Sequence, residues 1–282
     1  MKKSFKKILT KLKGRQLNIL YEIIPDKAVD QSFKLFLTPR KGRINAIAED
    51  FLKTASETAQ ITVDQHQIQT YIWKGGNRKV LLVHGWESNT FRWKALIEKL
   101  LKQNFTVISL DAPAHGNSDG EFSNVPVYGK AVVELIEKYK IQYAVGHSLG
   151  GFALLYQQYK GGVSSLKKMV LLAPALEMAN IVKGFQNTLG LKQPLIEDFG
   201  KRFEEEYDYS LSDFSVLNLL EKSDIPTLFI HDRDDQIVSY KESKNLVEQW
   251  DNAKLILTDG LKHSLRSEAV SDAVVKFLNK TN

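Results

Sequence analysis

The chain contains no cysteine among its 282 residues. Disulfides, thiolate metal ligands and a cysteine nucleophile are therefore excluded, and the composition suits a reducing compartment. No apolar run approaches the roughly 18 residues that a membrane-spanning helix requires. Lysines also interrupt the N-terminal segment where a secretory signal would need a continuous apolar region. We therefore expect a soluble cytoplasmic protein that builds its core from the 43% of its residues that are hydrophobic.

Acidic residues are missing from the start of the chain, where seven basic residues precede the first acid, Glu22. The rest of the chain carries 32 basic and 33 acidic residues. The net charge of +6 thus belongs to an N-terminal arm, which argues against a nucleic-acid-binding face. The apolar residues of that arm share one helical stripe: Phe5, Ile8, Leu9 and Leu12. The arm either packs on the protein, stays a solvated terminus, or contacts the inner membrane surface peripherally through residues 2–15.

Hydrophobic periodicity divides the chain into helical and strand segments. Residues 28–59 have the spacing of helices, with a break near residues 38–42. Residues 60–63 and 68–73 alternate around a polar turn, which predicts a hairpin. Apolar runs separated by helical segments follow at 80–83, 105–110, 143–145, 169–172, 227–230 and 255–257. This alternation predicts an α/β fold with a mostly parallel, eight-stranded sheet and helices on both faces.

The span of about fifty residues after residue 173 has no strand pattern. It predicts a helical insertion over the sheet edge, a lid at about residues 175–222. We therefore expect an N-terminal basic arm and helical extension at residues 1–59, followed by an α/β domain with its lid at residues 60–282.

The sequence Gly146-His-Ser148-Leu-Gly150 follows a predicted strand and precedes a predicted helix. A serine on such a sharp turn projects its hydroxyl out of the sheet, and glycines two positions before and after it let the backbone pass closely. Ser148 is therefore the candidate nucleophile.

A serine nucleophile needs a base that accepts its proton and an acid that orients the base. His263 follows the last predicted strand, and Asp235 follows the strand before it. All three residues then lie at the carboxyl edge of a parallel sheet, where ligand crevices form. Asp234 is an alternative to Asp235, and Asp111 is a weaker one because its strand precedes the nucleophile.

These motifs resemble the α/β-hydrolase superfamily of serine esterases and lipases. The resemblance spans residues 60–278 and includes residues 83–86, residues 111–118, the Ser148 turn and the loops of Asp235 and His263. It implies an oxyanion hole formed by the backbone N–H groups of Trp86 and Leu149, with Trp86 and His147 at the substrate. Ala114 and Asp232 stand where this superfamily usually has glycine. No metal site and no cofactor are expected.

The expected reaction is the hydrolysis of a small-molecule carboxylic ester through an acyl-enzyme on Ser148. Lipase, lysophospholipase or thioesterase action at a membrane surface is one alternative. A protein of another class, which binds a small molecule on this fold without turnover, is the other.

Overall fold

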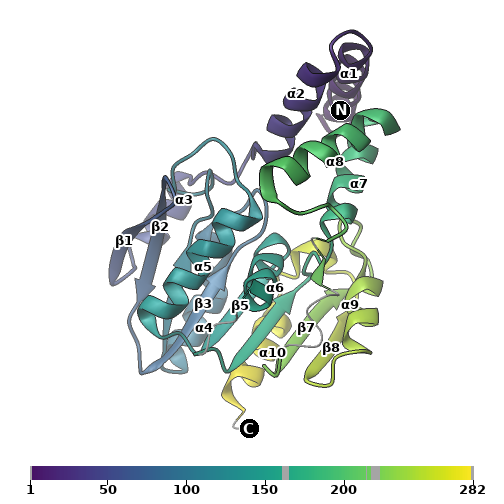
Figure 1. The fold of residues 1–282 in the computed structure, drawn as a ribbon. Coiled ribbons are helices and arrows are strands. Elements are labelled where there is room, and N and C mark those ends of the chain that lie inside the picture. Colours follow the sequence, from purple (N-terminus) through teal and green to yellow (C-terminus); the bar gives the residue numbers. More distant parts are fainter. Residues whose placement is uncertain (1, 161–164, 214, 217–222, 281–282) are drawn as a thin grey trace. The chain divides into compact units, whose positions relative to one another are not determined.

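Eight strands form a single sheet in the computed structural model (Figure 1), which describes residues 2–160, 165–213, 215–216 and 223–280. Their order is β1-β2-β4-β3-β5-β6-β7-β8, and only the β1–β2 and β2–β4 pairs are antiparallel. The predicted α/β fold with a mostly parallel sheet is therefore confirmed. The strands are β1 Glu57–Val63, β2 His66–Trp73, β3 Arg78–Val83, β4 Phe105–Leu110, β5 Tyr143–His147, β6 Lys168–Leu172, β7 Thr227–Asp232 and β8 Ala253–Thr258.

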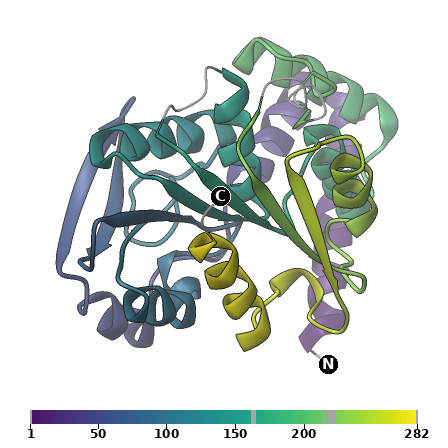
Figure 2. The ribbon, with the colours of Figure 1, turned by 90° about the horizontal axis from the view of Figure 1, so that it is seen from below.

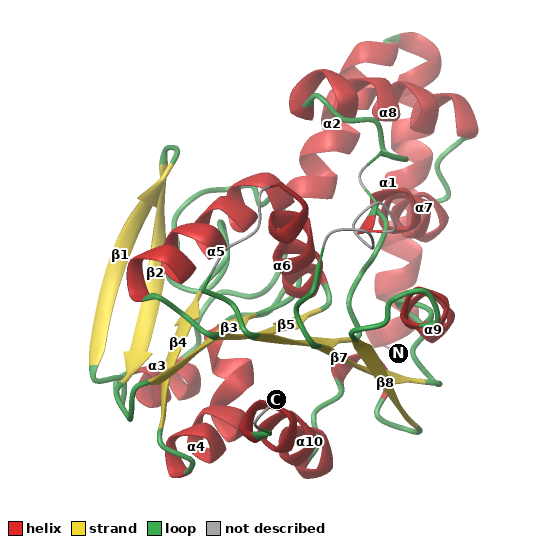
Figure 3. Cartoon of the chain, turned by 60° about the horizontal axis from the view of Figure 1, so that its bottom comes forward, coloured by secondary structure: helices red, strands yellow, loops and turns green. Residues whose placement is uncertain are grey.

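Helices cover both faces of the sheet (Figure 3). On one face lie α3 Ala46–Leu52, α4 Lys94–Lys102 and α10 Glu268–Asn279, and the view from below shows α4 and α10 beneath the strands (Figure 2). On the other lie α5 Val125–Tyr139, α6 Leu149–Lys160 and α9 Tyr240–Val247. Two short 3-10 turns, Thr90–Trp93 and Lys262–Ser264, complete this part of the chain.

The central strands β3, β5 and β6 are apolar on both faces because helices bury both. Residues 80–83 are fully buried. Beneath them Ile97 of α4 and Val274 of α10 join one core with residues of β3 and β4. Each such side chain contributes roughly 1.5–3 kcal/mol through burial. This core fixes the strand ends that carry the polar loops described below.

Residues 1–38 and 177–215 form a second compact unit. It contains four helices: α1 Lys2–Ile23, α2 Pro25–Leu37, α7 Met178–Leu189 and α8 Gln193–Tyr207. Its core gathers Leu17, Ala28, Leu189, Leu191 and Leu195. Polar contacts tie the two segments as well, because the Tyr21 hydroxyl donates to Asp198 at 2.6 Å and Lys192 pairs with Glu22 at 2.7 Å. The N-terminal helices and the inserted helices are thus packed partners.

The predicted hairpin and the predicted helix break near residues 38–42 are confirmed. The short helix α9 was not predicted. Residues 39–59 pack with the sheet unit, to whose core they add Leu52. The division into domains at residue 59 and the lid role of residues 175–222 stay predictions, and residues 214 and 217–222 of that insertion lie outside the described residues. No described helix is both long and apolar enough to span a bilayer.

Helix α6 passes so close to the end of β3 that Gly150 has no room for a side chain. A Cβ at Gly150 would lie 2.3 Å from the Val83 carbonyl oxygen, and one at Gly146 would lie 2.7 Å from the Gly151 Cα. Both obstacles are backbone atoms, which cannot rotate away. The glycines of the pentapeptide are therefore required by the packing of helix against sheet.

We expect Gly150→Ala to destabilise the protein by about 3 kcal/mol, because the strand or the helix must shift. Gly184→Ala is the matched control: Gly184 lies inside α7 with nothing within 4 Å of its Cβ position. There alanine should stabilise the helix by about 0.5–1 kcal/mol. Urea unfolding followed by circular dichroism compares the two variants, and equal stability would contradict the close-packing argument.

Candidate active site

Ser148 occupies the turn between β5 and α6 in a strained backbone conformation. Its φ is +51°, in the left-handed region that a residue with a Cβ rarely adopts. The turn is held by hydrogen bonds from the Ser148 N–H to the Leu172 carbonyl at 2.9 Å and from the Phe152 N–H to the Ser148 carbonyl at 3.0 Å. The strand-turn-helix context predicted for Ser148 is thus present.

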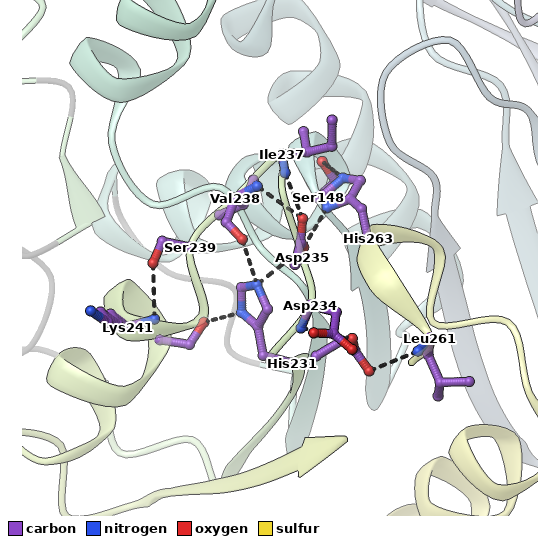
Figure 4. Close-up of polar contacts among 12 residues, drawn as sticks. Ser148, His231, Asp234, Asp235, Ile237, Val238, Ser239, Lys241, Leu261 and His263 are labelled. Carbon is purple, nitrogen blue, oxygen red and sulfur yellow. Dashed lines mark hydrogen bonds and ion pairs between the residues drawn. The ribbon is translucent and has the colours of Figure 1, made fainter. Parts of the chain in front are cut away.

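The structure brings Ser148, His263 and Asp235 together in one hydrogen-bonded chain (Figure 4). The His263 Nε2 lies 2.9 Å from the Ser148 Oγ, and the His263 Nδ1 lies 2.7 Å from the Asp235 Oδ2. An ionised carboxylate only accepts, so Nδ1 carries the proton and Nε2 is left free to accept from the serine hydroxyl. This is the geometry of a nucleophile, a base and an orienting acid.

The Asp235 carboxylate is held by three further groups besides its bond to His263. Its Oδ1 accepts from the N–H groups of Ile237 at 2.8 Å and Val238 at 3.1 Å, and the His231 Nε2 lies 3.2 Å from its Oδ2 (Figure 4). Burial raises the pKa of Asp235, but the hydrogen bonds from His231 and His263 outweigh it and hold that pKa well below the usual range. The acid is therefore an oriented, ionised carboxylate.

The two alternative acids lie in other networks. Asp234 accepts from the Gly260 N–H at 3.0 Å. Asp111 accepts from the N–H groups of Thr90 at 2.8 Å and Asn117 at 2.9 Å, and it ties the loop after β3 to the loop after β4. Of the three carboxylates considered, Asp235 is the one placed against His263.

The loop after β3 lies directly against the nucleophile. A Cβ on Gly85 would lie 3.0 Å from the Ser148 Cβ, so this approach requires glycine. Trp86 follows at once, and the Leu149 N–H is the first of helix α6. Within the described residues neither of these N–H groups donates to another protein group. The two donors predicted for an oxyanion hole are thus available, while their role stays a prediction.

Two buried histidines brace this loop. The His84 Nε2 accepts from the Ala112 N–H at 2.9 Å, and the His115 Nε2 accepts from the Glu87 N–H at 3.0 Å. Burial lowers the pKa of each ring to about 4, so both are neutral at physiological pH. The Trp86 indole stands edge-on to the His115 ring at 5.2 Å. Neutral imidazoles therefore fix the loop that carries Trp86.

The two departures from the superfamily pattern are explained by local geometry. Ala114 has a φ of +61°, a conformation that glycine adopts more easily. Asp232 is buried and accepts from the Thr258 hydroxyl at 2.7 Å and from the Leu261 N–H at 3.0 Å. It thereby joins the Asp235 loop to the His263 loop, a bracing role that the sequence did not reveal.

Arg92 was also missed by the sequence analysis. Its guanidinium donates to the His147 Nδ1 at 2.7 Å and to the Ser264 carbonyl at 3.2 Å, and the His147 Nε2 lies 2.8 Å from the His263 carbonyl. Burial lowers the pKa of Arg92 to about 9, which leaves it charged at neutral pH. Burial, Arg92 and His263 hold the pKa of His147 well below 6.5. Both ring nitrogens of His147 are thus occupied, and its predicted substrate contact stays a prediction.

Comparison with known proteins identifies the family of this chain. The model of the alpha/beta hydrolase family matches residues 80–275, and the chain belongs to that family. A bifunctional esterase/perhydrolase of Acinetobacter calcoaceticus is 25% identical, with 69% of this chain and 89% of the relative covered. A non-heme haloperoxidase of Rhodococcus erythropolis is 22% identical over 72% of this chain and 93% of its own.

Solved structures show the same fold. The Pyrococcus furiosus esterase Pf2001 has a TM-score of 0.66 at 20% identity, covering 86% of this chain and 97% of its own. Est1E of Butyrivibrio proteoclasticus, solved with ferulic acid, has a TM-score of 0.63 at 20% identity, covering 78% of this chain and 97% of its own. At these identities the likeness establishes the fold alone. Together with the family match it supports a hydrolase in general terms.

Proposed function

We propose that the protein is a serine hydrolase that cleaves carboxylic esters of small molecules through an acyl-enzyme on Ser148. The observation that carries this proposal is the hydrogen-bonded chain from the Ser148 Oγ through His263 to Asp235. A histidine that already accepts from the serine hydroxyl is placed to take its proton during attack.

The reaction would proceed in two balanced halves. In the first, the Ser148 Oγ attacks the ester carbonyl carbon while its proton passes to the His263 Nε2, which then protonates the departing alcohol. In the second, water loses a proton to the same nitrogen and attacks the acyl carbon. The bond from that carbon to the Ser148 Oγ then breaks, His263 returns the proton to Oγ, and the carboxylic acid is released. Asp235 stays ionised and stabilises the imidazolium that forms in each half.

Negative charge on the tetrahedral intermediate would fall beside the N–H groups of Trp86 and Leu149. The Leu149 N–H also lies at the N-terminus of α6, where the helix dipole favours an anion. Preorganised donors of this kind are worth about 2.7–4 kcal/mol each. The strained φ of Ser148 is consistent with a hydroxyl held in one position before substrate arrives.

The ester preference rests on the chemistry of a serine nucleophile and on the esterase activity in the name of the Acinetobacter relative. Lipase, lysophospholipase or thioesterase action remains the alternative within the same mechanism. A binding protein without turnover is disfavoured, because ligand binding alone does not require a serine, a histidine and an aspartate in hydrogen-bonding order.

Ser148→Ala should lower the turnover of p-nitrophenyl esters by about 10⁴-fold or more, because the nucleophile is removed. A series of acyl chains from two to sixteen carbons, measured on the wild type, separates esterase from lipase by the preferred length. If no ester of the series is hydrolysed by the folded wild type, the proposed function is wrong.

Asp235→Asn should lower kcat by about 10³-fold to 10⁴-fold, because an amide no longer fixes the tautomer of His263. Asp234→Asn is the neighbouring control with the same change of charge, and it should cost less than about tenfold because Asp234 contacts the Gly260 N–H instead. Steady-state kinetics on the best ester compares them. A larger loss in Asp234→Asn than in Asp235→Asn would reassign the acid.

A further inference from the structure

Helix α1 has two apolar faces, and the four-helix unit uses only one of them. On the packed face, a Cβ at Gly14 would lie 2.0 Å from the Leu189 carbonyl oxygen, and Leu17 is buried in the core that contains Leu191 and Leu195. This contact explains why α1 lies against α7. It leaves the opposite side of the helix without a protein partner within the described residues.

That opposite side carries a row of large apolar side chains, which we name the outer stripe. Its members are Ile8, Leu9, Leu12, Ile19 and Ile23, with exposures of 54%, 51%, 47%, 62% and 71%. Positions 8, 12, 19 and 23 are separated by four, seven and four residues, which places them on one side of an α-helix. Single exposed apolar residues are ordinary, whereas several on one side of a helix mark an interaction surface. The exposed polar side chains of Arg15 and Gln16 separate Leu12 from Ile19 in this row.

The charges around the outer stripe are basic except for Glu22. By helical period, Lys11 and Arg15 border one side and Lys13 borders the other. Four more lysines, at positions 2, 3, 6 and 7, belong to the first turns of the same helix. Glu22 lies by the same period between Lys11 and Arg15, and its charge is paired with Lys192. An apolar row between basic borders is complementary to an anionic lipid surface, where the alkyl groups enter the acyl boundary and the ammonium groups meet phosphate.

We propose that the outer stripe docks the protein on an anionic phospholipid bilayer, with α1 lying in the plane of the surface. A second copy of this chain fits less well, because pairing two outer stripes would bring two sets of basic borders together. This inference does not depend on the catalytic proposal. It makes specific the peripheral contact through residues 2–15 and extends the surface to Ile19 and Ile23.

Cosedimentation with vesicles tests the proposal on the full chain. Vesicles of phosphatidylglycerol and phosphatidylcholine should bind the wild type, and pure phosphatidylcholine should bind it about tenfold or more weakly. The triple variant Ile8→Ser, Leu12→Ser, Ile19→Ser should lose about tenfold or more of the binding. The double variant Lys13→Gln, Arg15→Gln should bind the anionic vesicles about fivefold more weakly for each charge removed. Added salt should also weaken the binding.

Ile47→Ser is the matched control, since Ile47 is 74% exposed but lies on α3 of the sheet unit. It should bind vesicles like the wild type, and circular dichroism verifies that every variant is folded. Equal binding of anionic and neutral vesicles, or unchanged binding of the triple variant, would overturn the proposal. A wild-type dimer in sedimentation equilibrium that the triple variant loses would identify a second copy as the occupant instead.

Arg92 supports an independent inference, which rests on the proposed function. Its guanidinium stacks over the Trp93 ring at 4.6 Å and joins the residue before the nucleophile to the loop of the base. Arginine only donates, so the His147 Nδ1 accepts and its Nε2–H donates to the His263 carbonyl. We infer that Arg92 is a positioning residue that sets the distance between Ser148 and His263.

Arg92→Gln should lower kcat by about tenfold to a hundredfold with little change in KM, because the base loop is misplaced while the substrate site is kept. Arg92→Lys keeps the charge but cannot donate to both acceptors in the same geometry, so its kcat should lie between those of the wild type and Arg92→Gln. Arg78→Gln is the control: Arg78 likewise covers an aromatic ring, Phe105 at 4.0 Å, and donates to two groups away from the site. Its kinetics should match the wild type.

Labelling of Ser148 by a fluorophosphonate separates the two claims. If the wild type is labelled but hydrolyses no ester, the ester proposal fails while the labelling rate still tests Arg92. A labelling rate and a kcat in folded Arg92→Gln or Arg92→Lys equal to those of the wild type would refute the positioning role. A loss of kcat in Arg78→Gln as large as that in Arg92→Gln would also refute the positioning role of Arg92.

Discussion

The close backbone approach between the Ser148 turn and the end of β3 is the constraint on which the site depends. Two positions at this contact, Gly85 and Gly150, leave too little room for a side chain, and Gly146 leaves none against helix α6. Because these glycines have no side chains, helix α6 can begin beside the loop of Trp86. Ser148, the N-terminus of α6 and the loop after β3 are therefore close together.

The sheet positions the other two residues of the site, Asp235 and His263. Parallel strands β5, β7 and β8 end at the same edge, so Ser148, Asp235 and His263 meet although more than a hundred residues separate the first from the last. Precision then comes from hydrogen bonds between loops. Asp232 joins the Asp235 loop to the His263 loop, and Arg92 joins the His263 loop to the turn before Ser148. Each tie uses a buried polar group whose partners are supplied by the neighbouring loop.

The sequence predicted what depends on local pattern and on order along the chain. Strands, the turn at Ser148 and the acid and base loops are all marked by periodicity or by turn residues, and the structure places the corresponding residues together. Arg92 and Asp232 could not be found this way, because their partners lie on other loops. The packing of residues 1–38 against 177–215 was missed for the same reason. Both segments have the periodicity of amphipathic helices, but periodicity does not indicate which surface the apolar face of a helix packs against.

The bracing of the Trp86 loop by neutral imidazoles ties the integrity of the site to proton concentration. In the unfolded chain these rings titrate near 6.5, whereas His84 and His115 in the folded chain titrate near 4. Below pH 6.5 the unfolded state takes up protons that the folded state refuses, so folding free energy is lost as the pH falls toward 4. Protonation of each ring lowers the free energy of unfolding by up to about 3 kcal/mol between pH 6.5 and pH 4. The same packing that rigidifies the loop thereby makes the folded state less stable as the pH falls below 6.5.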